Sequence, residues 1–270
     1  MNKINEFYNQ YTENKRLETK RSRQLEFITT MEYVKKYANQ SSIVADIGAG
    51  TGIYSFELAS ICKGIVAVDI VEKHVNEISS KIERLGIKNI AAKYGSAVDL
   101  RSLESNHFDI VLCLGPYYHL QKKEDRIKCI TECTRILKNN GLLFIGYINR
   151  QNAMLYYVKN RKYLDSSLYE KLECDNYTET SGFDPFLDIS FFSDPDLVKK
   201  EAESSGLEIV KDIGVDGIFY FLEDELTEMN EQQWNDLLKF HLKHCEDKSS
   251  FGMSMHGLAI CKKYKKPDCA

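Results

Sequence analysis

The sequence predicts an α/β protein whose core is a doubly wound, mostly parallel β-sheet. Between residues 41 and 148, short runs rich in β-branched residues alternate with segments whose apolar residues recur at helical spacing. This alternation is typical of parallel strands joined by crossover helices. The first run ends in glycines at alternate positions, 48, 50 and 52, as expected where a parallel strand passes into a helix through a tight turn.

Each element of this segment follows from its residue pattern. Residues 1–40 carry apolar residues at helical spacing and predict an N-terminal helical cap of one or two helices. Apolar runs then indicate strands near 43–47, 64–69, 89–94, 109–114 and 142–148. Helical periodicity indicates helices near 52–61, 71–85 and 121–138. Residues 41–148 are therefore the predicted core.

Residues 149–192 interrupt the alternation and are expected to form an insertion or lid. No strand pattern is clear before Ile189 to Phe192. The segment holds nine aromatic residues: Tyr156, Tyr157, Tyr163, Tyr169, Tyr177, Phe183, Phe186, Phe191 and Phe192. Two interpretations carry equal weight: the aromatic side chains pack into a core of their own, or they line a ligand pocket.

Residues 193–270 are expected to complete the core. Asp194 followed by Pro195 is a strong helix start, because the acid can cap the helix and proline suits its first position. This helix should end near Gly206. Strands are expected at Leu207 to Val210 and at Ser254 to Cys261, with a helical insertion near 226–245.

The glycine-rich turn limits the kind of ligand it could hold. Asp46 stands just before the glycines, and an acid there would repel a pyrophosphate but suits a ligand with a cationic end. The dinucleotide fingerprint places its third glycine where this chain has Ile53. A nicotinamide or flavin site is therefore disfavoured.

The glycine motif resembles the first motif of the class I S-adenosylmethionine (SAM)-dependent methyltransferases, which reads acid-x-G-x-G-x-G. SAM carries a sulfonium and an ammonium and has no phosphate. Three further segments resemble this family in the expected order: 64–69, 108–114 and 135–145. The resemblance implies a Rossmann-like, seven-stranded, mostly parallel sheet with an antiparallel last strand. It also implies in-line methyl transfer from SAM to a small-molecule acceptor, with S-adenosylhomocysteine as the product.

The resemblance also implies which residues bind the cofactor. Asp69 ends the second predicted strand, about 20 residues beyond the glycine turn, and is expected to accept hydrogen bonds from the ribose; capping the next helix is its alternative role. Ser96 stands where many family members have an acid that contacts the adenine amino group. The full predicted set is Asp46, Gly48, Ala49, Gly50, Gly52, Asp69, Ile70, Ser96, Ala97 and Leu114.

The loop after the fourth strand, residues 114–120, is the candidate catalytic segment. Ligands of open α/β sheets bind beyond the carboxyl ends of the strands, near the point where the strand order reverses. Tyr117, Tyr118 and His119 are therefore expected beside the methyl donor. We predict Tyr118 and His119 as catalytic residues, with His119 either a general base or packed against the next helix. Gly115 replaces a proline of the (N/D)PPY motif of amino-group nucleic-acid methyltransferases, which disfavours base methylation of the amino type.

Charge and hydropathy argue against other classes. The net charge of −4 argues against a dedicated nucleic-acid binder. A basic cluster near the N-terminus still leaves an RNA methyltransferase as an alternative: Lys15, Arg16, Lys20, Arg21 and Arg23. A SAM-binding module without turnover is the other alternative. No apolar run approaches the roughly 18 residues of a membrane span, and no signal peptide is recognisable, so a cytoplasmic location without membrane contact is expected.

Cysteine and histidine usage predicts no metal centre. The eight cysteines are scattered without a CxxC pair and are expected to be reduced thiols. His241, His244 and Cys245 lie close together in the sequence, but one helical turn supplies too few ligands for a metal ion.

Overall fold

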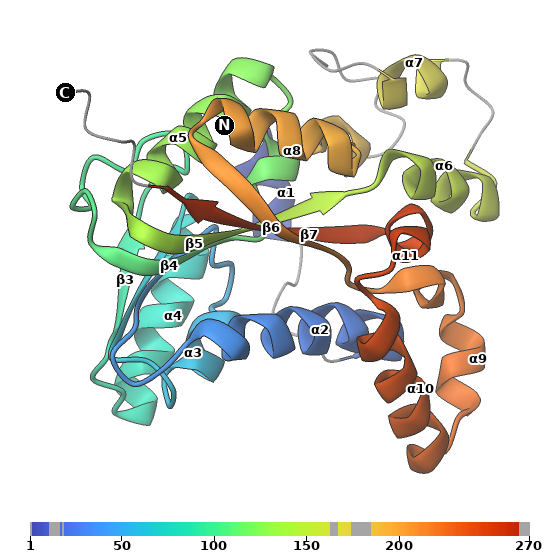
Figure 1. Ribbon diagram of the computed structural model, residues 1–270, viewed down its shortest axis with the longest axis horizontal. Helices are drawn as coiled ribbons and strands as arrows, with labels where there is room; N and C mark the ends of the chain where they lie inside the picture. Colours follow the sequence, from blue (N-terminus) through green and yellow to red (C-terminus); the bar gives the residue numbers. More distant parts are fainter. Residues whose placement is uncertain (1, 11–16, 18, 163–166, 174–184, 265–270) are drawn as a thin grey trace.

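The computed structural model describes residues 2–10, 17, 19–162, 167–173 and 185–264. Within these ranges seven strands form one sheet in the order β3-β2-β1-β4-β5-β7-β6, and helices cover both of its faces (Figure 1). The strands are β1 (Ile43–Ile47), β2 (Gly64–Asp69), β3 (Ile90–Tyr94), β4 (Phe108–Cys113), β5 (Leu137–Ile148), β6 (Leu207–Gly214) and β7 (His256–Lys263).

The topology matches the predicted one. Strands β1 to β5 pair in parallel, and β7 runs antiparallel to both β5 and β6. The chain moves outward from β1 to β3 and then crosses back to β4 on the other side of β1. The loops after β1 and β4 therefore diverge at the carboxyl edge, where such a reversal opens a crevice for a ligand.

The helical layers bury both faces of the sheet. In Figure 1, α2, α3 and α4 lie below the sheet, and α5 and α8 lie above it. Val44 and Ala45 are neighbours on β1 and are fully buried in opposite layers, as expected for a central parallel strand. The helices are α1 (Asn2–Gln10), α2 (Arg21–Tyr37), α3 (Ile53–Leu58), α4 (Glu72–Leu85), α5 (Lys123–Ile136), α6 (Arg150–Lys159), α7 (Ser167–Glu173), α8 (Pro195–Ser204), α9 (Glu223–Glu228), α10 (Glu231–His244) and α11 (Lys248–Met253), with the 3₁₀ helices η2 (Pro116–His119), η3 (Leu187–Ile189) and η4 (Gly217–Phe221).

Several predicted boundaries within the core are wrong. The helix predicted over 52–61 ends at Leu58. The helix predicted over 121–138 ends at Ile136, because Leu137 is already extended and begins β5. The strand predicted at 142–148 therefore starts five residues earlier, and Asn140 takes a left-handed conformation within it (φ 65°). Local periodicity located these elements, but pairing with β4 determined where the strand begins.

The second half differs more from the prediction. Asp194 does cap α8, accepting the Leu197 N–H at 2.9 Å, and Pro195 is the first helical residue. Strand β6 continues to Gly214, and β7 begins at His256 rather than at 254. The single helix predicted near 226–245 is two helices, because Asn230 forms a capping box that starts α10 afresh.

The buried aromatic side chains of the insertion pack into apolar clusters that also include residues from outside it. Tyr157 and Phe192 pack with Leu168, Leu172 and Leu187 in one buried cluster, while Phe191 joins the main core. No strand forms at residues 189–192. The next residue, Ser193, makes an isolated β-bridge to Asn149. Phe186 lies near His119, with ring centroids 6.0 Å apart. Tyr163, Tyr177 and Phe183 lie outside the described residues.

None of the helices in the described ranges is long and apolar enough to cross a membrane.

Candidate functional site

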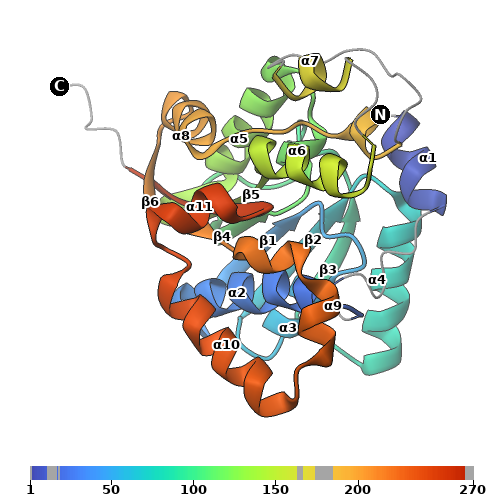
Figure 2. The same cartoon turned by 90° about the vertical axis from the view of Figure 1, so that its right-hand side faces the viewer.

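A large pocket lies at the carboxyl edge of the sheet, which faces the viewer in Figure 2. Its volume is about 1710 Å³, and residues from the loops after β1, β2, β3 and β4 line it. Pockets for one drug-sized ligand are typically about 300–1,000 Å³, so this one has room for two small molecules side by side. Every predicted cofactor or catalytic residue lines the pocket except Gly52.

The glycine turn brings bare backbone to the pocket wall. Gly48, Gly50 and Gly52 all have left-handed backbone, with φ of 75°, 56° and 81°. A Cβ on Gly48 would lie 2.5 Å from Pro116 Cγ, so no larger residue fits where the turn meets the loop after β4. Gly52 does not line the pocket. A Cβ there would meet Phe56 and Ile78 at 3.1 Å, and the residue is the N-cap of α3.

Asp69 links the ends of β1 and β2. One carboxylate oxygen accepts the Gly50 N–H at 2.8 Å, and the other accepts the Val71 N–H at 2.8 Å. His74 Nδ1 lies 3.3 Å from the second oxygen. Val71, rather than Asp69, is the cap residue of α4. A carboxylate has about four lone-pair directions, so these bonds leave acceptor capacity directed at the pocket.

Asp46 places a buried carboxyl group beneath the glycine turn. Its side chain accepts the Ser55 hydroxyl at 2.7 Å, and it is 2% exposed. Burial, with a smaller contribution from the nearby Asp69 charge, raises the pKa of Asp46 to about 6. A cationic group bound above this carboxyl would favour its ionised form.

The remaining predicted cofactor residues lie around the pocket on the loops after β2, β3 and β4. Ile70 follows β2, Ser96 and Ala97 follow β3, and Leu114 follows β4. Ser96 Oγ accepts the Val98 N–H at 3.4 Å, which holds its hydroxyl near the pocket.

The loop after β4 divides its aromatic residues between core and pocket. Tyr117 was predicted to face the ligand, and this is wrong: it is fully buried and donates its hydroxyl to Glu201 at 2.8 Å. Tyr118 and His119 line the pocket, with ring centroids 4.6 Å apart. The alternation arises because a short 3₁₀ helix turns successive side chains to different sides.

Both ring nitrogens of His119 form hydrogen bonds. Nδ1 lies 3.0 Å from the Ile189 carbonyl oxygen, which can only accept, so Nδ1 carries the proton. In the neutral ring, Nε2 then accepts the Tyr8 hydroxyl at 2.8 Å. Tyr8 belongs to α1, so the N-terminal helix is tied across the pocket to the loop after β4.

A buried ion pair holds this loop in place. The Arg126 guanidinium donates to both carboxylate oxygens of Glu201, at 2.9 and 3.1 Å, and to the carbonyl oxygens of Leu120 and Gln121. Glu201 also accepts the Tyr117 hydroxyl. Because both charges are buried and satisfied by several bonds, removing one partner would leave an unpaired buried charge.

Sequence reasoning missed the residues that reach the pocket from the N-terminal region. Lys3, Asn5 and Tyr8 of α1 line it, as does Glu26 of α2. Helical periodicity identified these helices, but no motif indicated which of their side chains would face a ligand.

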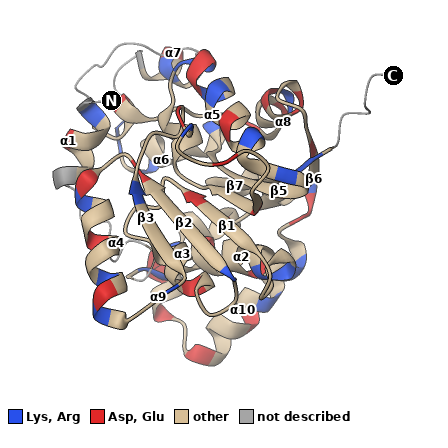
Figure 3. Ribbon diagram, turned by 90° about the vertical axis from the view of Figure 1, so that its left-hand side faces the viewer, with Lys and Arg blue, Asp and Glu red and all other residues tan. Residues whose placement is uncertain are grey.

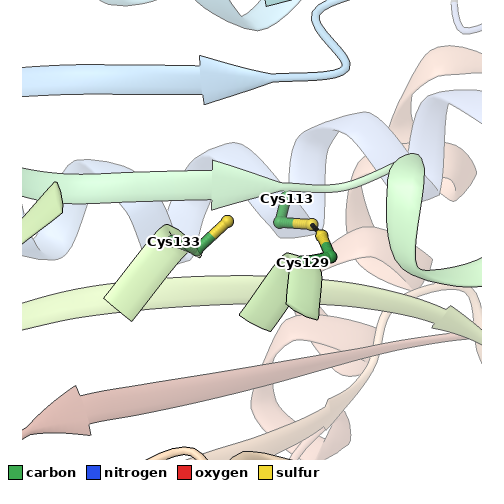
Figure 4. A group of neighbouring side chains, drawn as sticks. All are labelled: Cys113, Cys129 and Cys133. Carbon is green, nitrogen blue, oxygen red and sulfur yellow. Dashed lines mark hydrogen bonds between the residues drawn. The ribbon is translucent and has the colours of Figure 1, made fainter. Parts of the chain in front are cut away.

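His241 and His244, which the sequence places close together without predicting a metal site, contact different groups. His241 Nε2 lies close to Thr29 Oγ1 and the Val215 carbonyl oxygen, and His244 pairs with Asp247. In the described part of the chain, the one group of three close metal-type ligands is Cys113, Cys129 and Cys133, whose sulfur atoms lie within 4.8 Å of one another (Figure 4). The CxxxC spacing of Cys129 and Cys133 on α5 was the only sign of this cysteine group in the sequence. All three cysteines are buried among apolar residues, where cysteine packs as a small hydrophobic side chain.

The two arginines Arg21 and Arg23 of the basic N-terminal cluster are bonded within the molecule. Arg21 donates to the Leu226 and Met229 carbonyl oxygens and pairs with Glu231, and Arg23 donates to the Tyr220 hydroxyl. Lys15 and Arg16 lie outside the described residues. Figure 3 shows both signs of charge interspersed along α4 and α10, and such a mixture does not favour a nucleic-acid surface.

The amino-acid sequence is similar to that of known methyltransferases. Residues 44–141 match a family described as methyltransferase domain. An uncharacterized methyltransferase of Schizosaccharomyces pombe is 30% identical over 111 residues, 38% of this chain and 37% of that protein. The ubiquinone biosynthesis O-methyltransferase of Xanthomonas oryzae pv. oryzae (strain PXO99A) is 30% identical over 114 residues, 41% of this chain and 44% of that protein. The chain thus matches less than half the length of either relative.

Solved structures resemble the whole fold. A SAM-dependent methyltransferase, possible histamine N-methyltransferase, from Thermotoga maritima has a TM-score of 0.58 at 17% identity, covering 97% of this chain and 99% of that chain. A SAM-dependent methyltransferase from Methanosarcina mazei has a TM-score of 0.57 at 18% identity, covering 87% of this chain and 98% of that chain. At 17% and 18% sequence identity, these similarities concern the fold alone.

Proposed function

We propose that the protein transfers the methyl group of SAM to a small-molecule acceptor, on the premise that residues 44–141 match a methyltransferase domain family and lie in a seven-stranded sheet of the order β3-β2-β1-β4-β5-β7-β6. One observation carries the proposal. The carboxylate of Asp69 holds the glycine turn by the Gly50 N–H and keeps acceptor capacity at the wall of a pocket large enough for donor and acceptor together.

The residues present fit SAM as the cofactor. The ribose hydroxyls would meet Asp69, and the cationic methionine end would lie above Asp46 and the glycine turn. Gly48 and Gly50 leave no side chain between the cofactor and the backbone. Ser96 and Ala97 would border the adenine, with Ile70 beside the ribose and Leu114 towards the methyl group. A sulfonium-bound methyl group supplies the electrophile when SAM is bound.

The chain itself must align the acceptor and exclude water, because methyl transfer is an in-line displacement. Tyr118 and His119 lie beyond Leu114 and are proposed to contact the acceptor. The Tyr8 hydroxyl, bound to His119 Nε2, places α1 at the pocket wall. A helix along this wall favours a small acceptor over a nucleic-acid strand. The role of His119 as a general base stays a prediction.

Calorimetry and a labelling assay test the proposal. The purified protein should bind SAM and S-adenosylhomocysteine and should not bind NAD, because the glycine spacing lacks the third glycine of a dinucleotide site. With SAM carrying a tritiated methyl group, it should label an acceptor in a metabolite extract. Binding of NAD without SAM would contradict the proposal. SAM binding with no label transfer to any metabolite would indicate a binding module instead.

A further inference from the structure

His74 lies beside Asp69, the proposed ribose anchor, at the wall of the pocket. It is the third residue of α4, and its N–H donates to the Val71 carbonyl oxygen at 3.0 Å. This first turn of the helix brings the imidazole back to the end of β2. His74 and Asp69 both line the pocket, and they are only 3% and 6% exposed. No sequence motif indicated that His74 would belong to this site.

The His74 ring donates a hydrogen bond to the Asp69 carboxylate. Nδ1 lies 3.3 Å from Asp69 Oδ1, which also accepts the Val71 N–H at 2.8 Å. An ionised carboxylate can only accept hydrogen bonds, so Nδ1 carries the proton. Of the three bonds that the structure describes for this carboxylate, the one from His74 alone comes from a side chain.

These three bonds differ in which carboxylate oxygen they occupy. Each oxygen of a carboxylate has about two lone-pair directions. Oδ1 uses both of them, on the Val71 N–H and on His74 Nδ1, whereas Oδ2 uses one on the Gly50 N–H. The remaining direction belongs to the oxygen next to the glycine turn, where the ribose of the cofactor is proposed to lie. His74 therefore helps to select which oxygen a ligand would meet.

The bond from His74 also supports a negative charge that has another carboxyl group nearby. The charge of Asp69 adds to the effect of burial in raising the pKa of Asp46 to about 6, so the two acids interact electrostatically. A hydrogen bond donated to a carboxylate stabilises its negative charge. The charge of Asp69 is what would attract the hydroxyl donors of a ribose, and charged acceptors form the stronger hydrogen bonds.

An aromatic side chain from α1 packs against the His74 ring. The ring centroids of Tyr8 and His74 are 5.6 Å apart, with an interplanar angle of 72°, which is the favourable edge-to-face arrangement. Tyr8 lines the same pocket. The imidazole thus contacts a carboxylate and an aromatic ring, and these contacts restrict its rotation.

We propose that His74 is a positioning residue of the cofactor site, which holds the Asp69 carboxylate so that Oδ2 accepts a hydrogen bond from a ribose hydroxyl of SAM. This inference rests on the proposed SAM-dependent function. In this role His74 acts through Asp69 and takes no part in the transfer of the methyl group.

Two amide variants separate the contribution of Nδ1 from that of the rest of the ring. Asparagine places its amide nitrogen two bonds beyond Cβ, as histidine places Nδ1, and glutamine places it three bonds beyond, as histidine places Nε2. Calorimetry with S-adenosylhomocysteine should give nearly wild-type affinity for His74→Asn and about 3- to 30-fold weaker affinity for His74→Gln. Equal losses in the two variants, or no loss in His74→Gln, overturns the proposal.

Two further measurements test whether the loss acts through Asp69 and the ribose. An analogue of S-adenosylhomocysteine that lacks both ribose hydroxyls should bind His74→Gln and the wild type equally well. His74→Gln should also cause no further loss of S-adenosylhomocysteine affinity in a protein that already carries Asp69→Ala. A loss that persists with the analogue or in the Asp69→Ala protein would show that His74 acts on the cofactor by another route, and it would overturn the positioning role.

Controls separate this inference from folding defects and from the proposed function. His107→Gln alters a histidine whose side chain is 41% exposed and should bind S-adenosylhomocysteine as the wild type does. Thermal unfolding checks that each variant is folded. If His74→Gln does not fold, His74→Leu takes its place in every comparison, because leucine also lacks a donor. Failure of the wild type to bind S-adenosylhomocysteine would overturn the proposed function, whereas binding without a difference between the two amide variants overturns the role of His74 alone.

Discussion

The carboxylate of Asp69 accepts the backbone N–H of Gly50 at 2.8 Å, joining the loops that follow β2 and β1. Both residues were predicted to bind the cofactor, but the sequence did not indicate that they bind each other. The bond means that Asp69 acts twice: it shapes the glycine turn and presents the same carboxylate to the pocket. Substitutions at either residue should therefore affect the cofactor site together.

Replacing Asp69 should weaken SAM binding. Asp69→Ala removes a charged acceptor from the ribose position and leaves the Gly50 and Val71 N–H groups without their partner, a loss of about 1–3 kcal/mol or about 5- to 150-fold in affinity. Gly50→Val should weaken binding at least as much, because its left-handed backbone disfavours a β-branched residue. Calorimetry measures both. Asp236→Ala, an exposed acid on α10, is the control. Unchanged affinity in folded Asp69→Ala and Gly50→Val proteins would place the cofactor elsewhere.

Replacing Gly48 should destabilise the protein and the site together. A Cβ there would lie 2.5 Å from Pro116 Cγ, at a φ of 75°. Gly48→Ala is therefore expected to cost about 1–3 kcal/mol in the free energy of unfolding and to displace the loop that carries His119. Gly64→Ala is the matched control, because nothing lies within 4 Å of its Cβ position. Denaturant unfolding compares the two, and equal stability would contradict the argued close contact.

SAM affinity should depend on pH through Asp46. Burial raises the pKa of Asp46 to about 6, above its unfolded value, so the folded free protein holds an extra proton between about pH 4 and 6. Its stability therefore falls as the pH rises through this window. A cationic ligand needs the ionised carboxylate, so SAM affinity should drop about tenfold between pH 7 and pH 5.

Asp46→Asn removes the titrating group and should give a SAM affinity that changes little over this range. Calorimetry of the wild type and the variant at several pH values measures the difference. The same pH dependence in both proteins would show that another group is responsible.

Tyr8 and His119 should act as a unit. Tyr8→Phe removes the hydroxyl that His119 Nε2 accepts, and His119→Ala removes both the ring and its bond to Ile189. If the pair holds α1 across the pocket, both variants should lower turnover by a similar factor and keep the wild-type pH profile. A pH profile that becomes flat in His119→Ala, but not in Tyr8→Phe, would assign the general base to His119 instead.

Local pattern predicted much of the pocket wall that is proposed to hold the cofactor. A strand, a glycine turn and a helix are consecutive in the chain, so Asp46, Gly48 and Gly50 could be identified from their order alone. Asp69 could be identified because a βαβ unit returns the chain to the same edge after a nearly constant length. Gly52 shows the limit, since it serves the same turn but does not line the pocket.

The part of the pocket that is proposed to meet the acceptor depends on contacts between distant segments. Tyr117 and Tyr118 are adjacent and chemically alike, yet Glu201 on α8 draws one into the core and leaves the other at the pocket. Tyr8 meets His119 across 111 positions of sequence. No local periodicity encodes such a pairing.

The sequence by itself therefore determined the sheet, its order of helices and strands, and the glycine turn at the pocket wall, because these depend on hydrophobic spacing and on residues close together in the chain. The tertiary structure decided which side chains from distant parts of the chain become neighbours. Asp216 and His256 become neighbours only because β6 and β7 run antiparallel at the sheet edge, and Glu26 joins them only because α2 packs beside that edge. Their proximity is set by packing of the whole molecule, which residue order alone does not specify.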